Sequence, residues 1–420
     1  MIYFKKITNL FKKNKIVFFK KLTIKIFKII ISVPFFPLSI AILTFIIIIK
    51  PFFHIRVGPL PTTRIGHFAQ NVDLFLSYKK YEQKNKTLDI FFLEKFISNK
   101  YLLKIWKKKI VILNKLIFTQ VYILISILRL KNHTIPIVNS DRDNFNFYSN
   151  THISKNINFS SEEEKLGYKI LKKIGVRKSH KFVCLITRDS DYLNTYHAGN
   201  DWTYHNYRDV DIQNYYLAAE ALTKKGYYVL RMGTRNKKKM ISENKKIIDY
   251  SFSEHKSDFM DIFIPSKCVF YISNGTGPDA LPKIFRKPIA WVNIVPVAFL
   301  PAFRKDYVYL FKRHYSKTLS RDLTLKEIFR LGVADSLNSS VFKEKKIKLI
   351  ENTPQEICNV VLELHQMINN KKYLKRDLNN NIFWNIYEEN IARYNLKHLH
   401  GILFGKYSSD FLKNNISFLQ

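Results

Sequence analysis

Apolar and polar positions along the chain predict alternating strands and helices. In the N-terminal part, an extended entry from residue 54 leads into a turn at 64–67 and a helix through Phe68, Val72 and Phe75. Strands are then expected at 88–93 and 110–114, and helices at 98–108 and 115–130. Such alternation predicts an α/β fold with a parallel, doubly wound sheet.

The second half repeats this alternation. Ser160 or Ser161, followed by Glu163 or Glu164, predicts a capped helix that runs to about residue 174. Continuous apolar runs predict buried strands, and periodic segments predict helices. The expected strands are 182–188, 227–233, 268–277 and 288–293, and the expected helices are 211–225, 278–286, 324–331 and one that opens at Pro354.

The length of 420 residues suits two α/β domains with appendages. The stretch 133–162 is rich in Asn, Asp and Ser and predicts a linker, with a boundary near residue 155. We expect an N-terminal segment at 1–53, a Rossmann-like domain at 54–155 and a second such domain at 156–370. Residues 371–420 are expected to form C-terminal helices that could cross back to the first domain.

The N-terminal residues have the pattern of a segment that associates with a membrane. Residues 1–28 contain nine lysines and no acid, and residues 29–49 carry no charge. Pro34 and Pro37 interrupt the apolar run, and Lys50 and Arg56 make its far side basic again, so both flanks are expected in the cytosol. We expect a monotopic or single anchor on the cytosolic face of the cytoplasmic membrane, without a cleaved signal peptide.

The chain has a formal net charge of +37 at pH 7, which favours polyanionic partners such as anionic lipid, nucleic acid or phosphate-bearing substrates. The lysine excess is equally compatible with compositional drift on solvated surfaces. The three cysteines, Cys184, Cys268 and Cys358, are far apart and lack CxxC spacing. This argues against a disulfide framework and a structural zinc site, and for a reducing compartment.

The strongest local motif is a β-rich run that ends in Asn274, Gly275, Thr276 and Gly277, with a helix expected from Pro278. At the carboxyl end of a parallel strand, such a loop can direct backbone N–H groups and a helix dipole at a diphosphate. The alternative is a tight turn in which the glycines only supply positive φ angles. The motif is not a Walker loop, because no GKS or GKT follows it.

Two more strand ends carry arginine. Arg188 follows one strand and precedes Asp189, and Arg231 ends another and precedes Gly233. Two guanidinium groups that converge on one cleft would neutralise a leaving nucleoside diphosphate without a metal. A surface ion pair is the alternative for each arginine taken alone.

Residues 189–211 form a long polar and aromatic stretch, which suits a substrate-facing loop. Tyr207 and Arg208 are its acceptor-side candidates. Asp191 and Asp211 are further candidates, although a helix cap or an ion pair is the simpler role for an acid here.

The early turn supplies Arg64, Gly66 and His67 at the start of a helix. We expect Arg64 and Gly66 on the acceptor side. His67 is the first candidate for a base that removes the acceptor hydroxyl proton, because imidazole titrates near neutral pH. Helix capping or packing is an equal alternative for His67, and Asp73 is the second candidate base.

The chain resembles a family of bacterial glycosyltransferases encoded in surface-polysaccharide gene clusters. The resemblance rests on RIGHFAQNVDLFL, on YRDVDIQNYYLAAEALTKKGYYVLRMG, on SDFMDIFIPSKCVFYISNGTGPDALPKIFRKPIAWVN and on IENTPQEI, and it covers roughly residues 55–370. The order of motifs is also similar to heptosyltransferases of the two-lobed GT-B fold. In place of their Asp-Ser-Gly motif followed by His, this chain has Ser273-Asn274-Gly275-Thr276-Gly277, which leaves the donor sugar and nucleotide open.

The resemblance implies metal-independent transfer of a sugar from a nucleotide-sugar donor to a lipid-linked or glycan acceptor, with no cofactor and no nucleic-acid partner. It also implies that residues 54–155 form the acceptor-side domain and residues 156–370 the nucleotide-sugar-binding domain. Two other functions stay open. One is a polysaccharide pyruvyl transferase, or another transferase on a similar scaffold. The other is a non-enzymatic basic protein that binds membranes or nucleic acid through charge alone.

Overall fold

The computed structural model describes residues 23, 33–82, 87–136, 142–150, 152–188, 203–234 and 238–420. The chain forms two compact units. Unit 1 comprises Met1–Thr63, Gln83–Ile97 and Trp106–Asn139, and unit 2 comprises Arg64–Glu82, Ser98–Ile105 and Ser140–Gln420. The first helix after strand β1 therefore belongs to unit 2. The domain boundaries expected near residues 53, 155 and 370 stay predictions.

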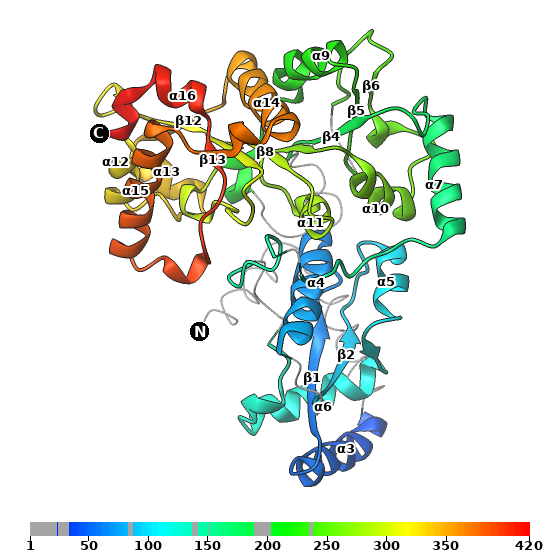
Figure 1. Ribbon diagram of the computed structural model, residues 1–420. Helices are drawn as coiled ribbons and strands as arrows, with labels where there is room; N and C mark the ends of the chain where they lie inside the picture. Colours follow the sequence, from blue (N-terminus) through cyan, green and yellow to red (C-terminus); the bar gives the residue numbers. More distant parts are fainter. Residues whose placement is uncertain are drawn as a thin grey trace. The chain divides into compact units, whose positions relative to one another are not determined.

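Unit 1 is built on a three-stranded parallel sheet with the order β1-β2-β3. Its strands are β1 (His54–Leu60), β2 (Thr87–Leu93) and β3 (Val111–Ile112), and its helices are α3 (Phe36–Ile49) and α6 (Lys115–Ile127). The two helices pack side by side (Figure 1). Leu43 and Ile46 of α3 share a buried core with Val121 and Ile125 of α6.

Helix α3 coincides with most of the uncharged run that we expect at the membrane. Val33–Phe35 form a 3-10 turn before it, and Pro37 lies in its first turn, where a missing N–H costs nothing. The helix has 14 residues. Within the ranges that the structure describes, no helix is both long and apolar enough to cross a bilayer. The lysines expected to flank the run at residues 1–28 lie outside the described residues.

Unit 2 contains a seven-stranded parallel sheet with the order β13-β9-β8-β7-β4-β5-β6. The strands are β4 (Phe182–Ile186), β5 (Tyr228–Arg231), β6 (Ile247–Ile248), β7 (Tyr271–Ser273), β8 (Ile289–Ile294), β9 (Tyr307–Phe311) and β13 (Lys406–Tyr407). The chain builds outward from β4 to β6 and then returns to place β7 on the other side of β4. The predicted doubly wound sheet is confirmed, and its strand order reverses between β4 and β7.

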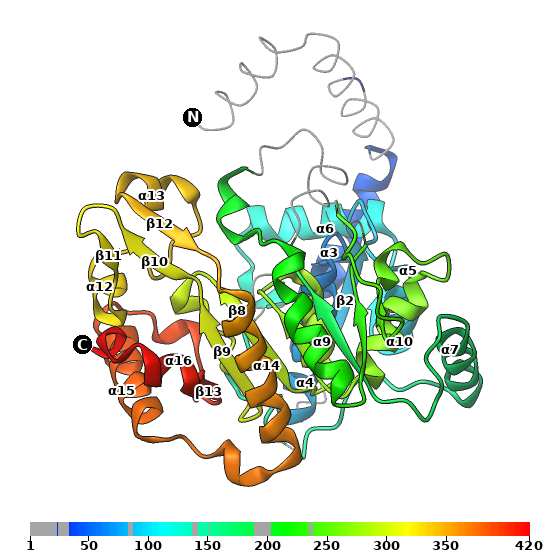
Figure 2. The same cartoon turned by 90° about the horizontal axis from the view of Figure 1, so that it is seen from above.

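Helices cover both faces of this sheet (Figures 1 and 2). Helices α9 (Tyr216–Lys224) and α14 (Pro354–Asn369) pack together on one face, and α10 (Asp258–Lys267) and α11 (Ala280–Ile284) lie on the other. The remaining helices that contribute to the site or its support are α4 (Ile65–Glu82), α5 (Lys100–Trp106) and α7 (Ser161–Lys173). The predicted capping box of α7 is confirmed, with Ser160 and Glu163 bonding reciprocally.

A small antiparallel sheet completes the described strands of unit 2, in the order β11-β10-β12. It consists of β10 (Arg313–Ser316), β11 (Arg321–Asp322) and β12 (Ile347–Ile350), with α12 (Leu325–Arg330) and α13 (Ser339–Glu344) beside it in sequence.

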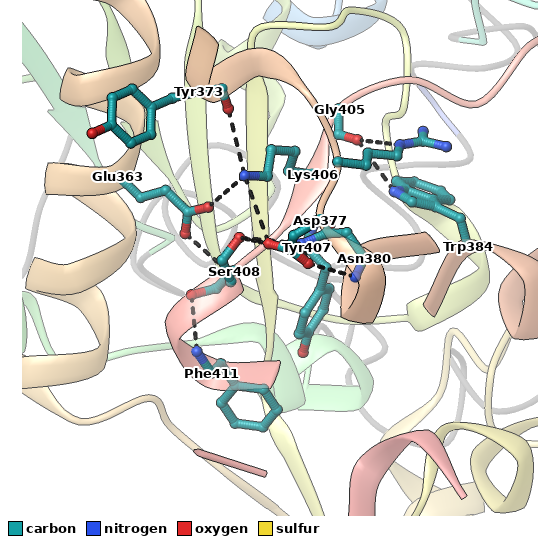
Figure 3. A network of polar contacts seen from close by, with 12 residues as sticks. Glu363, Tyr373, Asp377, Asn380, Trp384, Gly405, Lys406, Tyr407, Ser408 and Phe411 are labelled. Atoms are coloured by element: carbon teal, nitrogen blue, oxygen red, sulfur yellow. Dashed lines mark hydrogen bonds and ion pairs between the residues drawn. The ribbon is translucent and has the colours of Figure 1, made fainter. Parts of the chain in front are cut away.

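The C-terminal elements α15 (Leu378–Arg393), β13 and α16 (Ser409–Asn414) all belong to unit 2. Figure 3 shows how they are held: Lys406 pairs with Glu363 of α14 at 3.5 Å, and Trp384 donates its indole N–H to Gly405 O at 3.2 Å. Asn144 and Asn146, from the range expected for the first domain, bond to residues 398–402. Both partners of this contact lie inside unit 2.

Candidate functional site

A cavity of about 310 Å³ opens in unit 2 at the carboxyl ends of β4, β5 and β7. This edge of an open parallel sheet, where the strand order reverses, is where such folds bind ligands. The lining residues come from the three strands or just after them, from the first two turns of α4, from the segment before α5, from the 203–208 turn, and from α10 and α11. The polar residues and glycines among them are Arg64, Gly66, His67, Gln70, Ser98, Asn99, Thr187, Arg188, His205, Arg208, Gly233, Thr234, Asp261, Tyr271, Thr276, Gly277 and Lys283.

The early and late glycine motifs meet at this cavity. A Cβ atom added to Gly66 would lie 2.9 Å from Gly277 O and 3.1 Å from Gly277 Cα. Only a residue without a side chain allows the first turn of α4 to approach the 274–278 loop this closely. The 18-residue helix α4 thus begins at the cavity, where the positive end of its dipole favours an anion.

Arg188 lies directly after β4 and lines the cavity with its side chain 11% exposed. Its Nε donates to Asp209 Oδ1 at 3.0 Å, and its buried Nη2 has no hydrogen-bond partner among the described residues. Burial lowers the pKa of Arg188 and the neighbouring Arg208 lowers it further, while Asp209 opposes both effects. The arrangement therefore has an unsatisfied donor and positive charge in excess.

Arg208, which the sequence suggested only as an acceptor-side residue, is the second arginine of the cavity lining. Its Nη2 donates to Gly275 O. Asn274 ties the two arginine segments together, because its Oδ1 accepts from Arg188 N at 2.8 Å and its Nδ2 donates to Arg208 O at 3.0 Å. Asn274 is buried and does not line the cavity, so it holds the backbone at both arginines without contacting the cavity itself.

The described lining of the cavity carries a clear excess of positive charge. Arg64, Arg188, Arg208 and Lys283 contribute cations, and Asp261 is the one acid among the described lining residues. Both carboxylate oxygens of Asp261 are already bonded to Lys256 Nζ, at 2.6 and 2.7 Å. The cavity is thus suited to a ligand with more than one negative charge.

Two histidines line the same cavity. Burial, assisted by Arg188, Arg208 and Arg64, lowers the pKa of His205 to about 4, so this imidazole is neutral at pH 7. His67 lies in the first turn of α4, and its buried Nδ1 has no hydrogen-bond partner among the described residues. His67 therefore lines the cavity, and its role as a base stays a prediction.

Arg231 corrects the sequence-based picture. Its side chain is 2% exposed, and Nη1 donates to Asp249 Oδ2 at 2.8 Å and to Lys238 O at 2.5 Å. It does not line the cavity, because it is the last residue of β5 and is buried within the fold. The prediction that Arg188 and Arg231 converge on one cavity is therefore wrong. The residues after β5 that do line the cavity include Gly233 and Thr234.

Asp73, the second candidate base, is also placed away from the cavity. It is fully buried, accepts from Asn156 Nδ2 at 3.0 Å and pairs with Arg286 Nη1 at 3.3 Å. Burial raises the pKa of its carboxyl, and Arg286 and Asn156 lower it. Because its charge is balanced inside the protein and it does not reach the cavity, Asp73 is a structural residue in this arrangement.

The 274–277 loop differs in part from its predicted role. Gly275 N donates to Ser273 Oγ at 3.2 Å, and Thr276 N donates to the buried carboxylate of Asp279. Helix α11 after it has only five residues. Some of the backbone N–H groups that we expected to face a diphosphate are therefore bonded within the loop, although Thr276 and Gly277 do line the cavity.

Tyr207 lines a second cavity of about 460 Å³, whereas Arg208 lines the first. Five lysines line this second cavity together with Asp209 and Glu351: Lys312, Lys317, Lys343, Lys346 and Lys348. The Nζ of Lys312 donates to Asp209 O at 2.7 Å. Asp209 therefore contacts Arg188 through its side chain and Lys312 through its backbone.

Two predicted acids, Asp189 and Asp191, lie outside the described residues. Asp211 caps the 3-10 turn that follows it by accepting from Gln213 N at 3.0 Å, which is the simpler role considered for it. In the part of the chain that the structure describes, no group of three or more His, Cys, Asp or Glu side chains could hold a metal ion.

Comparisons with known proteins give distant matches only. No family model matches the chain, and no curated protein matches it. The E. coli ADP-heptose lps heptosyltransferase II aligns with a TM-score of 0.43 at 8% identity, over 75% of this chain and 100% of that chain. A glycosyl transferase family 9 structure from Veillonella parvula aligns with a TM-score of 0.41 at 11% identity, over 74% of this chain and 96% of that chain. Both alignments are too distant to bear on the chemistry of the site.

Proposed function

We propose that this protein is a bacterial glycosyltransferase of the GT-B type, which transfers a sugar from a nucleotide-sugar donor to a lipid-linked or glycan acceptor. The observation that carries the proposal is the pair of arginines, Arg188 and Arg208, that meets the start of α4 at one basic cavity. The motifs shared with polysaccharide-cluster glycosyltransferases support the same class.

In this proposal the donor's diphosphate occupies the basic cavity. Nη2 of Arg188, which lacks a partner among the described residues, donates to a phosphate oxygen, and the α4 amides and Arg208 face the same charge. When the bond between the sugar C1 and the phosphate oxygen breaks, the electron pair stays on the nucleoside diphosphate. These cations stabilise that leaving group, which is the task that metal ions perform in other transferases.

His67 is the proposed base. As the acceptor oxygen forms its bond to C1, the acceptor hydroxyl proton passes to an imidazole nitrogen of His67. His205, held neutral beside the arginines, is a second imidazole within the same cavity and is proposed to contact the donor.

The binding part of the proposal is tested by titrating nucleoside diphosphates into the full chain in a calorimeter at constant ionic strength. A charge-assisted hydrogen bond contributes about 1.5–3 kcal/mol, so Arg188→Ala should weaken the best ligand by about 10- to 150-fold. Arg188→Lys should recover only part of this loss, because ammonium cannot bind bidentately. Arg321→Ala, which removes a half-exposed arginine of β11 that does not line the cavity, is the matched control.

The chemical part is tested with membranes that contain the protein and a panel of radiolabelled nucleotide sugars, with phosphoenolpyruvate added to the panel. Transfer of label from a nucleotide sugar is expected, and His67→Gln should lower kcat by about 10²- to 10⁴-fold while leaving diphosphate affinity unchanged. Label transfer from phosphoenolpyruvate alone would identify a pyruvyl transferase instead. Absence of nucleotide binding in both wild type and variants would overturn the proposal.

A further inference from the structure

Helix α3 is apolar on all sides, although only one side is covered. Its buried face, Ser39, Leu43 and Ile46, follows helical spacing and packs against α6. The uncovered face carries Phe45 and Ile48, followed by Phe52 just after the helix, with exposed fractions between 56% and 80%. A helix that is hydrophobic all round needs a second apolar partner.

Helix α6 continues this uncovered surface. Ile123, Ile127 and Leu128 are 48% to 68% exposed, while Val121 and Ile125 of the same helix are buried. The carboxyl ends of the two helices lie at the same edge of unit 1, since α3 leads directly into β1 and His133, just after α6, bonds through Nδ1 to Ile55 O at 2.7 Å. We call these six exposed residues, from Phe45 to Leu128, the α3–α6 surface.

The charge of unit 1 is strongly positive. Its described residues include nine Lys and Arg and two acids, Asp89 and Glu94. Asp89 is neutralised by Arg56 at 2.6 Å, and Glu94 accepts from Thr63 N at 3.1 Å. The basic residues at the edge where α3 and α6 end include Lys50, Arg129 and Lys131, and the turn before β3, which starts from the same edge of the parallel sheet, adds Lys107, Lys108 and Lys109.

We infer that the α3–α6 surface docks on an anionic lipid bilayer. A bilayer offers both apolar depth and negative headgroups, whereas a second copy of this chain would bring the same positive charge against itself. At 1.5 Å per residue α3 is about 21 Å long, against a hydrocarbon core of about 30 Å, so the helix lies in the interface with its exposed face inserted.

This inference extends the proposed function by naming the surface through which the transferase would reach a lipid-linked acceptor. It concerns binding to lipid alone, so it can be tested without substrate. A failure of vesicle binding would not contradict nucleotide binding in unit 2. A failure of nucleotide binding would likewise not contradict lipid binding by unit 1.

The experiment is co-sedimentation of the full chain with vesicles of phosphatidylcholine, with and without phosphatidylglycerol. Ile48→Gln combined with Ile127→Gln should lower the partition coefficient on anionic vesicles by about tenfold or more, because both side chains lose their apolar insertion. Lys107→Gln, Lys108→Gln and Lys109→Gln together should have a similar effect at low salt and little effect at high salt.

The matched control is Ile241→Gln combined with Leu378→Gln, two unit 2 residues that are 77% and 74% exposed. It should bind vesicles as wild type does, and circular dichroism should show that all variants fold. Equal binding by wild type and the Ile48/Ile127 variant would overturn the inference and leave the basic residues 1–28 as the lipid contact. A wild-type dimer in sedimentation velocity that the same variant dissolves would also overturn it, because the surface would then join two copies.

Discussion

Gly66 and Gly277 touch through their backbones, yet the structure predicts opposite outcomes when each is replaced by alanine. A Cβ on Gly66 would come within 2.9 Å of Gly277 O, a backbone atom that cannot rotate away. A Cβ on Gly277 would meet nothing nearer than Gly66 N at 3.7 Å, which is ordinary van der Waals contact. Gly277 also lacks a positive φ angle, so alanine fits its backbone.

Helix propensity alone would favour Gly66→Ala by up to about 1 kcal/mol, whereas overpacking against a fixed backbone costs about 1–3 kcal/mol. We therefore expect Gly66→Ala to lower the free energy of unfolding by up to about 2 kcal/mol. Gly277→Ala should raise it by about 0.4–1 kcal/mol, because the unfolded chain loses conformational freedom. Since the clash displaces the first turn of α4, only Gly66→Ala should also weaken diphosphate binding.

Thermal unfolding followed by circular dichroism orders the three proteins, and calorimetric titration with the best nucleoside diphosphate ranks their affinities. The expected order of Tm is Gly277→Ala at or above wild type, with Gly66→Ala below both. A Gly66→Ala protein that matches wild type in Tm and affinity would refute the close approach of α4 to the 274–278 loop.

Three further predictions concern residues outside the lining of the cavity. Arg231→Met should lower stability in urea unfolding by about 3–5 kcal/mol, because Asp249 loses its buried partner, while diphosphate affinity stays unchanged. Burial raises the pKa of Asp143 to about 6, so the folded protein holds the extra proton and stability falls as pH rises from about 4 to about 6. Asp143→Asn should flatten this part of a Tm against pH profile. Ser160→Ala should reduce stability by about 1 kcal/mol through loss of the α7 cap, which Glu163→Gln should affect less.

Four strands of the large sheet could be predicted because β4, β5, β7 and β8 lie in apolar runs bounded by turn residues, whereas β10 and β13 carry no such run. The run at 182–188 and its neighbours place their carboxyl ends at one edge, so the positions of Arg188 and of the 276–277 loop followed from topology alone. Helix ends were also predictable where local chemistry sets them, as Ser160 and Pro354 show.

Tertiary partners could not be read from the sequence. Arg231 and Asp73 look like functional residues in a linear motif, but Asp249 and Arg286 neutralise them from elsewhere in the fold. His205, in contrast, did not look like a functional residue in the sequence, because the 203–208 turn has no periodic pattern. The surroundings of its imidazole come from Arg188 and Arg64, which are not its neighbours in the sequence. The separation of Tyr207 from Arg208 into two cavities likewise depends on that 3-10 turn.

The position of β13 beside β9 has a consequence for how the protein is made. Residues 406–407 leave the ribosome 95 positions after Phe311, which at about 5–20 residues per second means a delay of roughly 5–20 s. During that interval strand β9, whose residues are all buried in the folded protein, has an open hydrogen-bonding edge, and such an edge can template aggregation. Nascent chains stalled before Lys406 should therefore need chaperone protection that chains released after Tyr407 do not.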